Sequence, residues 1–543
     1  MKKRNCLVVI LSLILPLLVA AQEGTRYVDS IFASVQVERD VPYATNISVL
    51  TVNNGDPDTV ELVMDIYSPV GDLEEQRPVV IYLHSGYLLP PFFNGLVTGS
   101  KLDSAVVEVC TRLAKRGYVA VAPSYRLGWS PLAASLEVNK QTFLQALYRG
   151  IHDTHSSIRF LRKTVIEDSN PYHIDPDKIA LWGERVGGSI ALGVAYLDDY
   201  SEVTSDSKFF NGDTAEPYLL LDRDGDVFGL QPALLHIPNW QEYTSEVDFI
   251  FNQGGFLMDT SWINHDSPFQ PPVASIHSIS DPFFPFGAGP QWQTWAPPNF
   301  LSWVIHGSRT VHEKANSVGI NQGLDMSAWQ AVPGAEEINM TIEALSDVPL
   351  DLITLGQSPT TYASPHLYPL LSDNIAMSSP WSWWGKPQLD SVVMEANEIY
   401  GTDFDSDILH EYSQLTYAPN MSAEHARAYI DTTMMVFLPR ACQALQLEPC
   451  SIVNRNSEEL VDAEETKLRL APNPGNQFVL IDSDPMYPIK GIQIYDAMGR
   501  YLFARYQINS WQYRLERGAL AAGTYFVQVL FEEGVSAQRV VFR

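Results

Sequence analysis

A short glycine-flanked segment holds the residue with the clearest chemical meaning in this sequence. An apolar run from Ile179 to Trp182 leads into Gly183-Glu-Arg185-Val-Gly187, and an apolar helical pattern follows. A strand, a sharp turn and a helix in this order lift the central side chain clear of the strand end, where a serine would act as a nucleophile. Arg185 occupies that place, and a guanidinium that stays protonated cannot attack an ester. The segment therefore predicts the framework of a hydrolytic site without its nucleophile.

The elements that must position this turn alternate between buried strands and amphipathic helices. Apolar runs predict strands at 77–83, 118–123, 178–182, 248–252, 273–278 and 350–355, and helical spacing is found at 102–116, 140–163 and 423–447. Strands buried on both faces and separated by helices form mostly parallel sheets that are covered on both sides. We therefore expect an α/β domain over residues 22–453.

The two ends of the chain differ in character from this unit. Residues 1–21 begin with basic residues and continue as an apolar run ending in small residues, which is typical of a cleaved signal peptide. A membrane anchor fits less well because the apolar run is short, and no membrane span is expected in the mature chain. Residues 454–467 are polar and acidic and predict a linker. Residues 468–543 read as short alternating strands, which predicts a small β-sandwich.

The charge balance and the cysteines narrow the classes of function. The chain has 35 basic against 64 acidic residues and a formal net charge of −29, so nucleic acid is not an expected partner. No phosphate-binding loop, dinucleotide fingerprint or metal-ligand spacing occurs, so neither a cofactor nor a metal is expected. Cys442 and Cys450 are close enough to close a small loop in an oxidising compartment, and Cys110 is expected to be a buried free thiol.

Several landmarks surround the turn in a characteristic order. They are His84-Ser-Gly-Tyr87 after the first buried strand, Gly117-Tyr-Val-Ala-Val-Ala-Pro-Ser-Tyr-Arg126, Ile174-Asp-Pro-Asp-Lys-Ile-Ala180 before the turn, and Ile276-His-Ser-Ile-Ser-Asp281. From Asp65 to about residue 355 the chain resembles secreted bacterial carboxylesterases of the α/β-hydrolase superfamily, a group that includes acetyl- and feruloyl-esterase-like proteins. The resemblance implies an α/β-hydrolase fold and ester hydrolysis as the family reaction.

In this superfamily a serine, a carboxylate and a histidine follow one another along the chain. The resemblance puts Arg185 at the nucleophile position and Asp281 at the position of the carboxylate. It implies a histidine shortly after the last core strand, and His366 is the first histidine beyond the strand expected there. His410 and His425 are later alternatives.

The resemblance also implies two sources of oxyanion donors. These would be the backbone N–H groups of Val186 and of Gly86 or Tyr87. Ser85 stands where the family usually has a second glycine, and His84 is expected mainly to support this loop.

Alternative roles for Arg185 stay open at this point. Its side chain could form a partly buried ion pair with Asp281, or bind a carboxylate or sulfate ligand in the pocket where a substrate would bind in the family. The arginine could also have no role and have arisen by drift after catalysis was lost. An open pocket would favour binding, and a pocket filled by the chain's own side chains would favour a structural role. A displaced nucleophile, Ser189 or Ser85, would instead make the chain an active carboxylesterase. We expect an inactive hydrolase fold with a binding or structural role.

Two aromatic stretches and the C-terminal region complete the expectations. The aromatic residues are expected to pack a loop-rich cap or to stack aryl or carbohydrate ligands; they are Phe283, Phe284, Phe286, Trp292, Trp295, Trp303, Trp381, Trp383 and Trp384. The segments Ala471-Pro-Asn-Pro474, Ile494-Tyr-Asp-Ala-Met-Gly499 and Leu520-Ala-Ala-Gly-Thr-Tyr-Phe-Val527 resemble the C-terminal sorting domain of the type IX secretion system. That resemblance implies the type IX machinery as a partner and export through the periplasm to the outer surface or the medium.

Overall fold

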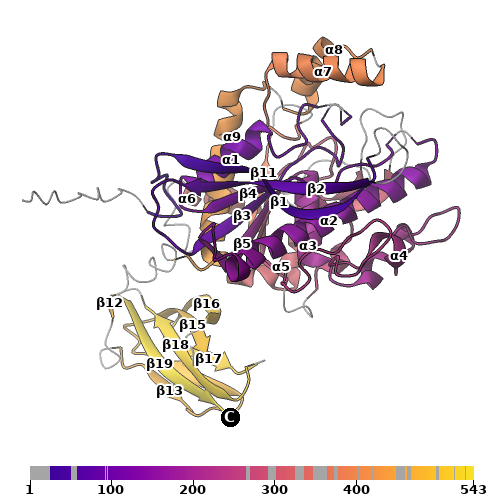
Figure 1. Cartoon of the computed structure of the whole chain (residues 1–543). Coiled ribbons are helices and arrows are strands. Elements are labelled where there is room, and N and C mark those ends of the chain that lie inside the picture. The colour runs from indigo at the N-terminus through magenta and orange to yellow at the C-terminus, as the bar shows by residue number, and fades with distance from the viewer. Residues whose placement is uncertain are drawn as a thin grey trace, which may run out of the picture.

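The structure is a computed structural model, shown in Figure 1. It describes residues 25–543 except 51–57, 92, 95, 132, 265–269, 292–300, 325–334, 347–363, 372–376, 402, 419, 448–458, 461–465, 497–500, 519 and 532–533. The expected signal peptide, the strand expected at 350–355, Cys450, Trp292 and Trp295 therefore lie outside the described residues.

A large sheet forms the centre of the first domain. Among the described residues it has eight strands in the order β1-β2-β4-β3-β5-β6-β8-β11. The strands are β1 (Val35–Ser48), β2 (Asp58–Pro69), β3 (Arg77–Leu83), β4 (Val119–Pro123), β5 (Ile174–Glu184), β6 (Phe249–Gln253), β8 (Val273–Ser278) and β11 (Leu367–Leu370). β1 and β2 run antiparallel at one edge, and the pairs from β4 to β11 are parallel. The expected α/β class is confirmed.

Helices cover both faces of this sheet (Figure 1). The described α-helices of the domain are α1 (Ser104–Ala114), α2 (Leu136–Glu167), α3 (Val186–Tyr196), α4 (Leu221–Asp224), α5 (Ser308–Ser317), α6 (Ala335–Ser346), α7 (Lys386–Tyr400), α8 (Ser406–Thr416) and α9 (Ala423–Ala444), of which α7 and α8 pack on each other away from the sheet. Alternate residues of β3 face opposite sides: Ile81 shares one hydrophobic cluster with Ile190 of α3, and Tyr82 shares another with Phe437 of α9. This two-sided burial is why the strands read as continuous apolar runs.

Smaller elements decorate the domain. β7 (Phe256–Leu257), β9 (Ala288–Gln291) and β10 (Leu301–Gly307) form a three-stranded sheet next to α5. Cys110 is a buried free thiol, as expected, and Cys442 is disulfide-bonded.

The C-terminal residues form two sheets around one shared core. The strands are β12 (Glu459–Leu460), β13 (Arg469–Ala471), β14 (Phe478–Asp482), β15 (Ile489–Asp496), β16 (Tyr501–Ser510), β17 (Gln512–Glu516), β18 (Gly523–Leu530) and β19 (Gly534–Phe542). Val479 and Leu515 of one sheet share a hydrophobic cluster with Ile492 and Val529 of the other. Two residues of the expected linker, Glu459 and Leu460, pair with β19 and so join this unit.

Candidate functional site

The turn around Arg185 joins β5 to α3 through a strained backbone. Arg185 has φ 55° and ψ −116°, a conformation that L-residues rarely adopt. Chain segments approach so closely here that side chains would collide: a Cβ on Gly183 would lie 2.2 Å from the carbonyl oxygen of Gly187, and a Cβ on Gly187 would lie 2.2 Å from that of Leu83. The two glycines therefore keep the geometry that presents the central side chain at the carboxyl ends of β5 and β3.

Arg185 uses this position to form a buried ion pair. Its guanidinium pairs with the carboxylate of Asp281, with Nη1 on Oδ2 and Nη2 3.2 Å from Oδ1. Nη1 also donates to the carbonyl oxygen of Ser378 over 3.3 Å. The side chain of Arg185 is 1% exposed and that of Asp281 is 0% exposed, so the ion pair is buried away from solvent.

Asp281 is held from several directions. It follows β8 by three residues, and its Oδ1 accepts the backbone N–H groups of Phe283 and Phe284 over 2.8 and 3.0 Å. Burial alone would raise the pKa of this carboxyl, but Arg185 and the adjacent His277 outweigh burial and lower it below its ordinary value. Because the folded pKa is lowered, the pair stabilises the fold at neutral pH and loses this effect as the pH falls below about 4.

Aromatic rings close over the pair. The guanidinium carbon of Arg185 lies 4.6 Å from the ring centre of Phe284 and 5.4 Å from that of Phe283. The ring of Tyr87 packs against both phenylalanines, with centroids 5.4 and 5.8 Å apart. Tyr417 contacts Phe283 and is also buried. These rings give a desolvated guanidinium favourable cation–π contacts and bury the ion pair.

The other aromatic residues of the two stretches are also mostly internal. Phe286, Trp303, Trp381 and Trp384 are buried. Their burial agrees with a packed cap. Trp383 is half-buried, and the guanidinium carbon of Arg427 lies 5.4 Å from its ring centre.

The expected oxyanion loop lies beside the sealed pair. Gly86 and Tyr87 both have positive φ, and Val186 is the first residue of α3 directly after Arg185. His84 stacks on Tyr125 with ring centroids 4.3 Å apart, and its Nδ1 lies 2.7 Å from the carbonyl oxygen of Ser85. His84 therefore supports the loop, as expected.

The structure does not bring His366 to Asp281. His366 precedes β11, at the amino end of that strand, whereas Asp281 follows the carboxyl end of the neighbouring β8. Its Nδ1 lies 3.2 Å from Nε of Arg440, which belongs to α9. The last described strand of the eight-stranded sheet is β11, so a histidine of the triad would have to follow residue 370, and residues 371–385 contain none. His410 on α8 lies beside Gln414, and His425 begins α9 with Nδ1 3.2 Å from the carbonyl oxygen of Asn420.

The serines proposed as substitute nucleophiles are buried in structural contacts. Ser189 accepts the backbone N–H of Phe256 over 3.0 Å, and Ser85 lies 3.4 Å from the hydroxyl of Tyr417. Each is 2% exposed.

Sequence reasoning missed His277, although it lies four residues before Asp281 at the end of β8. Its Nδ1 lies 2.8 Å from Oγ of Ser308, and its Nε2 lies 3.6 Å from Oδ2 of Asp281. Ser308 also accepts a hydrogen bond from Asn252 over 3.0 Å. A serine, a histidine and an aspartate thus lie in sequence, and the side chains of all three are buried.

Buried neutral histidines predict sensitivity to mild acid. Burial lowers the pKa of His84 to about 4 and that of His312 to about 3. An unfolded histidine titrates near about 6.5, so the stability due to each neutral ring is present above that pH and is lost as the pH falls toward 4. At pH 5 each such ring costs about 2 kcal/mol of folding free energy.

We therefore expect the thermal midpoint to fall between pH 7.5 and pH 5, and His84→Asn to make that fall shallower. His173→Asn is the control, because the side chain of His173 is 47% exposed, and it should leave the profile unchanged. If the thermal midpoint falls equally with pH in the native chain and in His84→Asn, the buried neutral ring of His84 is not a cause of the acid sensitivity.

The fold and the strained turn define an α/β-hydrolase domain of the esterase type. Residues 64–286 match the family model BD-FAE, and residues 469–543 match the secretion system C-terminal sorting domain. The chain therefore contains an esterase-like α/β-hydrolase domain followed by a type IX sorting domain. The sorting domain indicates secretion to the cell surface or the extracellular space. Within the described part of the chain, no helix has the length and apolarity needed to cross a bilayer.

Solved structures of bacterial esterases are similar to part of the chain. The apo form of Thermogutta terrifontis esterase 2, from a Planctomycetes species, has 17% identity and covers 45% of this chain and 74% of its own, with a TM-score of 0.25. Esterase B from Lactobacillus rhamnosis, in a structure with a tributyrin phosphonate, has 14% identity and covers 46% of this chain and 67% of its own, with a TM-score of 0.25. A search of curated proteins gives no match.

Proposed function

We propose that this protein is an exported α/β-hydrolase-fold protein that does not hydrolyse esters and acts through binding or structure at the cell surface. The observation that carries the proposal is the buried ion pair between Arg185 and Asp281, which occupies the nucleophile and carboxylate positions at once. Because the pair is sealed by Phe283 and Phe284, the old active site serves as an internal support of the fold and does not bind a ligand.

Two further features support the loss of catalysis. A serine hydrolase needs a base that accepts the nucleophile's proton, and no histidine follows β11 in residues 371–385. The carbonyl oxygen of Ser378, in that segment, instead accepts a hydrogen bond from Arg185. Arg185 thus stands at the nucleophile position, and the segment in which the base would lie instead supplies a carbonyl oxygen, that of Ser378, to Arg185.

Ester hydrolysis by the mature chain tests this proposal. With short-chain aryl esters such as 4-nitrophenyl acetate and butyrate, we expect the native protein to match the buffer rate. We also expect Arg185→Ser to remain silent, because the histidine described beside Asp281, His277, directs its Nδ1 to Ser308 and its Nε2 toward Asp281, which leaves neither nitrogen for a serine at 185. A rate clearly above buffer that survives repurification would refute the proposal.

The second candidate function is an active carboxylesterase with a displaced nucleophile. The observation in its favour is the line formed by Ser308, His277 and Asp281. If the native chain hydrolyses esters, Ser308→Ala should abolish the activity under this alternative, whereas Ser85→Ala and Ser189→Ala should retain it. Activity lost in either of the latter two would place the nucleophile beside Arg185 instead.

A further inference from the structure

The helices α7 and α8 form a hairpin that stands away from the central sheet (Figure 1). Its inner side is fixed in the fold, because Leu389 and Val393 of α7 belong to the main hydrophobic cluster of the domain and Leu409 of α8 packs against that cluster. The two helices also contact each other. Most of the remaining surface of the hairpin is exposed.

The base of the hairpin is tied together and to the elbow. The backbone N–H groups of Ser378 and Ser379, before α7, donate to the carbonyl oxygen of Tyr417, after α8, over 3.1 and 2.8 Å. Glu184 of the elbow accepts a hydrogen bond from Nε1 of Trp381 over 2.9 Å. A partner that docks on the hairpin therefore meets a surface that is already attached to the body of the domain, which lowers the entropic cost of binding.

The outer side of α8 carries an apolar stripe. Ile408, Tyr412 and Leu415 follow one another at positions i, i+4 and i+7, which places them on one face of the helix. Ile408 and Leu415 are each 65% exposed, and Tyr412 is 38% exposed. Apolar side chains at this spacing normally pack against another element, and a group of them exposed together marks a site of interaction.

The surface around this stripe is strongly negative. Residues 386–416 contain seven acidic side chains and one basic side chain, that of Lys386, so this segment has a formal charge of −6 over 31 residues, against −29 over 543 for the whole chain. Lys386 pairs with Asp390 and Asp407. Asp407 and Glu411 are exposed and lie one helical turn apart along one flank of the stripe. The negative charge is thus concentrated in the hairpin and borders its apolar face.

This combination selects among the partners that an apolar stripe could bind. A second copy of the chain would bring two negative hairpins together, and a bilayer of anionic lipids would also be repelled. A helix with its own apolar stripe and with lysine or arginine beside it satisfies both features. Its apolar side chains pack on the stripe of α8, and its cations pair with the flanking carboxylates.

We propose that the outer face of α8 docks a cationic amphipathic helix of a partner protein. Ile408, Tyr412 and Leu415 pack on the apolar face of that helix, and Glu411 pairs with one of its cations. The proposal is independent of the proposed loss of ester hydrolysis: activity at the elbow would refute that loss and leave the docking surface in place.

Fluorescence anisotropy with the mature full-length chain tests the proposal. The probe is a labelled peptide of leucine and lysine, about four helical turns long, with its leucines on one face. We expect it to bind with a dissociation constant below about 200 μM, and an isomer with the leucines distributed around the helix to bind about tenfold more weakly. Ile408→Ser/Leu415→Ser should weaken the first peptide about tenfold. Leu73→Ser/Leu234→Ser is the matched control, since these leucines are exposed elsewhere, and it should bind as the native chain does.

A charge variant keeps the test independent of any folding defect in the serine variant. Glu411→Lys retains the apolar stripe and should also weaken the peptide, whereas Glu242→Lys, at a glutamate exposed elsewhere, should weaken it much less. Equal affinity for the two peptides, a weaker dissociation constant than expected, or native-like binding by Ile408→Ser/Leu415→Ser would each overturn the proposal. It would also be overturned by a dimer in sedimentation velocity, or by binding to phosphatidylglycerol vesicles, that this variant abolishes.

Discussion

Arg185→Met is expected to lower the stability of the hydrolase domain by about 3–5 kcal/mol, because it leaves the carboxylate of Asp281 buried without a counter-charge. The variant also loses the contacts of the guanidinium with the rings of Phe283 and Phe284. Differential scanning calorimetry of the mature chain should show the thermal midpoint of this domain reduced on the order of 5 °C. Arg185 would then be a major internal support, and not a residue retained by drift.

A double variant separates the ion pair from simple packing. Asp281→Asn removes the charge but keeps an oxygen for the backbone N–H groups of Phe283 and Phe284, so Arg185→Met/Asp281→Asn should recover most of the loss. Lys386→Met is the control, because Lys386 and Asp390 form a pair with side chains 30% and 48% exposed, and it should leave the thermal midpoint almost unchanged. Additive losses in the double variant would show that Arg185 and Asp281 stabilise the fold separately.

The juxtaposition of Arg185 and Asp281 could be inferred from the sequence because both follow strands with long apolar runs. The carboxyl ends of parallel strands meet at one edge of the sheet, so residues nearly a hundred positions apart become neighbours. The glycines at 183 and 187 gave a second signal, since only they permit the close approach of α3 to β3. Strand order and turn geometry were therefore accessible without the structure.

The histidine position could not be predicted in the same way. β11 has only four residues, Leu367–Leu370, with Pro369 among them, and such a segment carries almost no strand signal. The run at 350–355 has the stronger pattern, and choosing it placed His366 after the last strand, whereas His366 precedes β11. The partners of Arg159 were equally hidden, because they are Phe228 and Ser245, far along the chain from α2.

Two buried arginines at opposite ends of the sheet differ in their partners. Arg185 has its carboxylate and a ring on its face, while Arg159 has hydrogen bonds to Phe228 and Ser245 but no anion among the described residues. A third buried arginine, Arg126, resembles Arg185 in having a carboxylate partner, Asp153.

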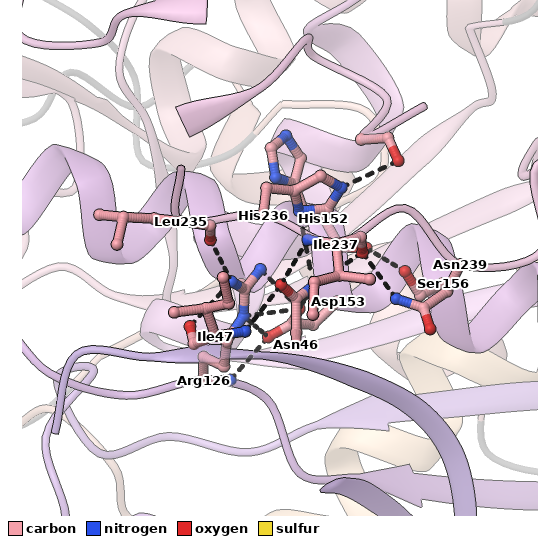
Figure 2. Close-up of polar contacts among 12 residues, drawn as sticks. Asn46, Ile47, Arg126, His152, Asp153, Ser156, Leu235, His236, Ile237 and Asn239 are labelled. Atoms are coloured by element: carbon pink, nitrogen blue, oxygen red, sulfur yellow. Dashed lines mark hydrogen bonds and ion pairs between the residues drawn. The ribbon is translucent and has the colours of Figure 1, made fainter. Parts of the chain in front are cut away.

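Asp153→Asn is expected to cost about 3–5 kcal/mol, because it leaves Arg126 charged and buried with no anion. The side chains of Arg126 and Asp153 are both 0% exposed, and Asp153 also accepts the backbone N–H of Arg126 over 2.8 Å (Figure 2). Calorimetry should show a lower thermal midpoint, and hydrogen exchange should become faster in residues 226–239, which Arg126 and Asn46 attach to the core. Ser156→Ala is the control on the same helix, since its hydroxyl bonds only the carbonyl oxygen of His152, and it should change neither reading by much.

Removing both charges should distinguish the pair of Arg126 and Asp153 from the pair of Arg185 and Asp281. Arg126 donates to the carbonyl oxygens of Ile47 and Leu235, whereas Arg185 donates to only one carbonyl oxygen, that of Ser378. Arg126→Met/Asp153→Asn therefore leaves two part-buried carbonyl oxygens without this donor and should recover only part of the loss, because an acceptor that loses its donor and is partly shielded from water is costly. Full recovery would mean that the network acts only through its net charge. Failure to recover, with faster exchange in 226–239, would show that Arg126 fixes this segment through its hydrogen bonds.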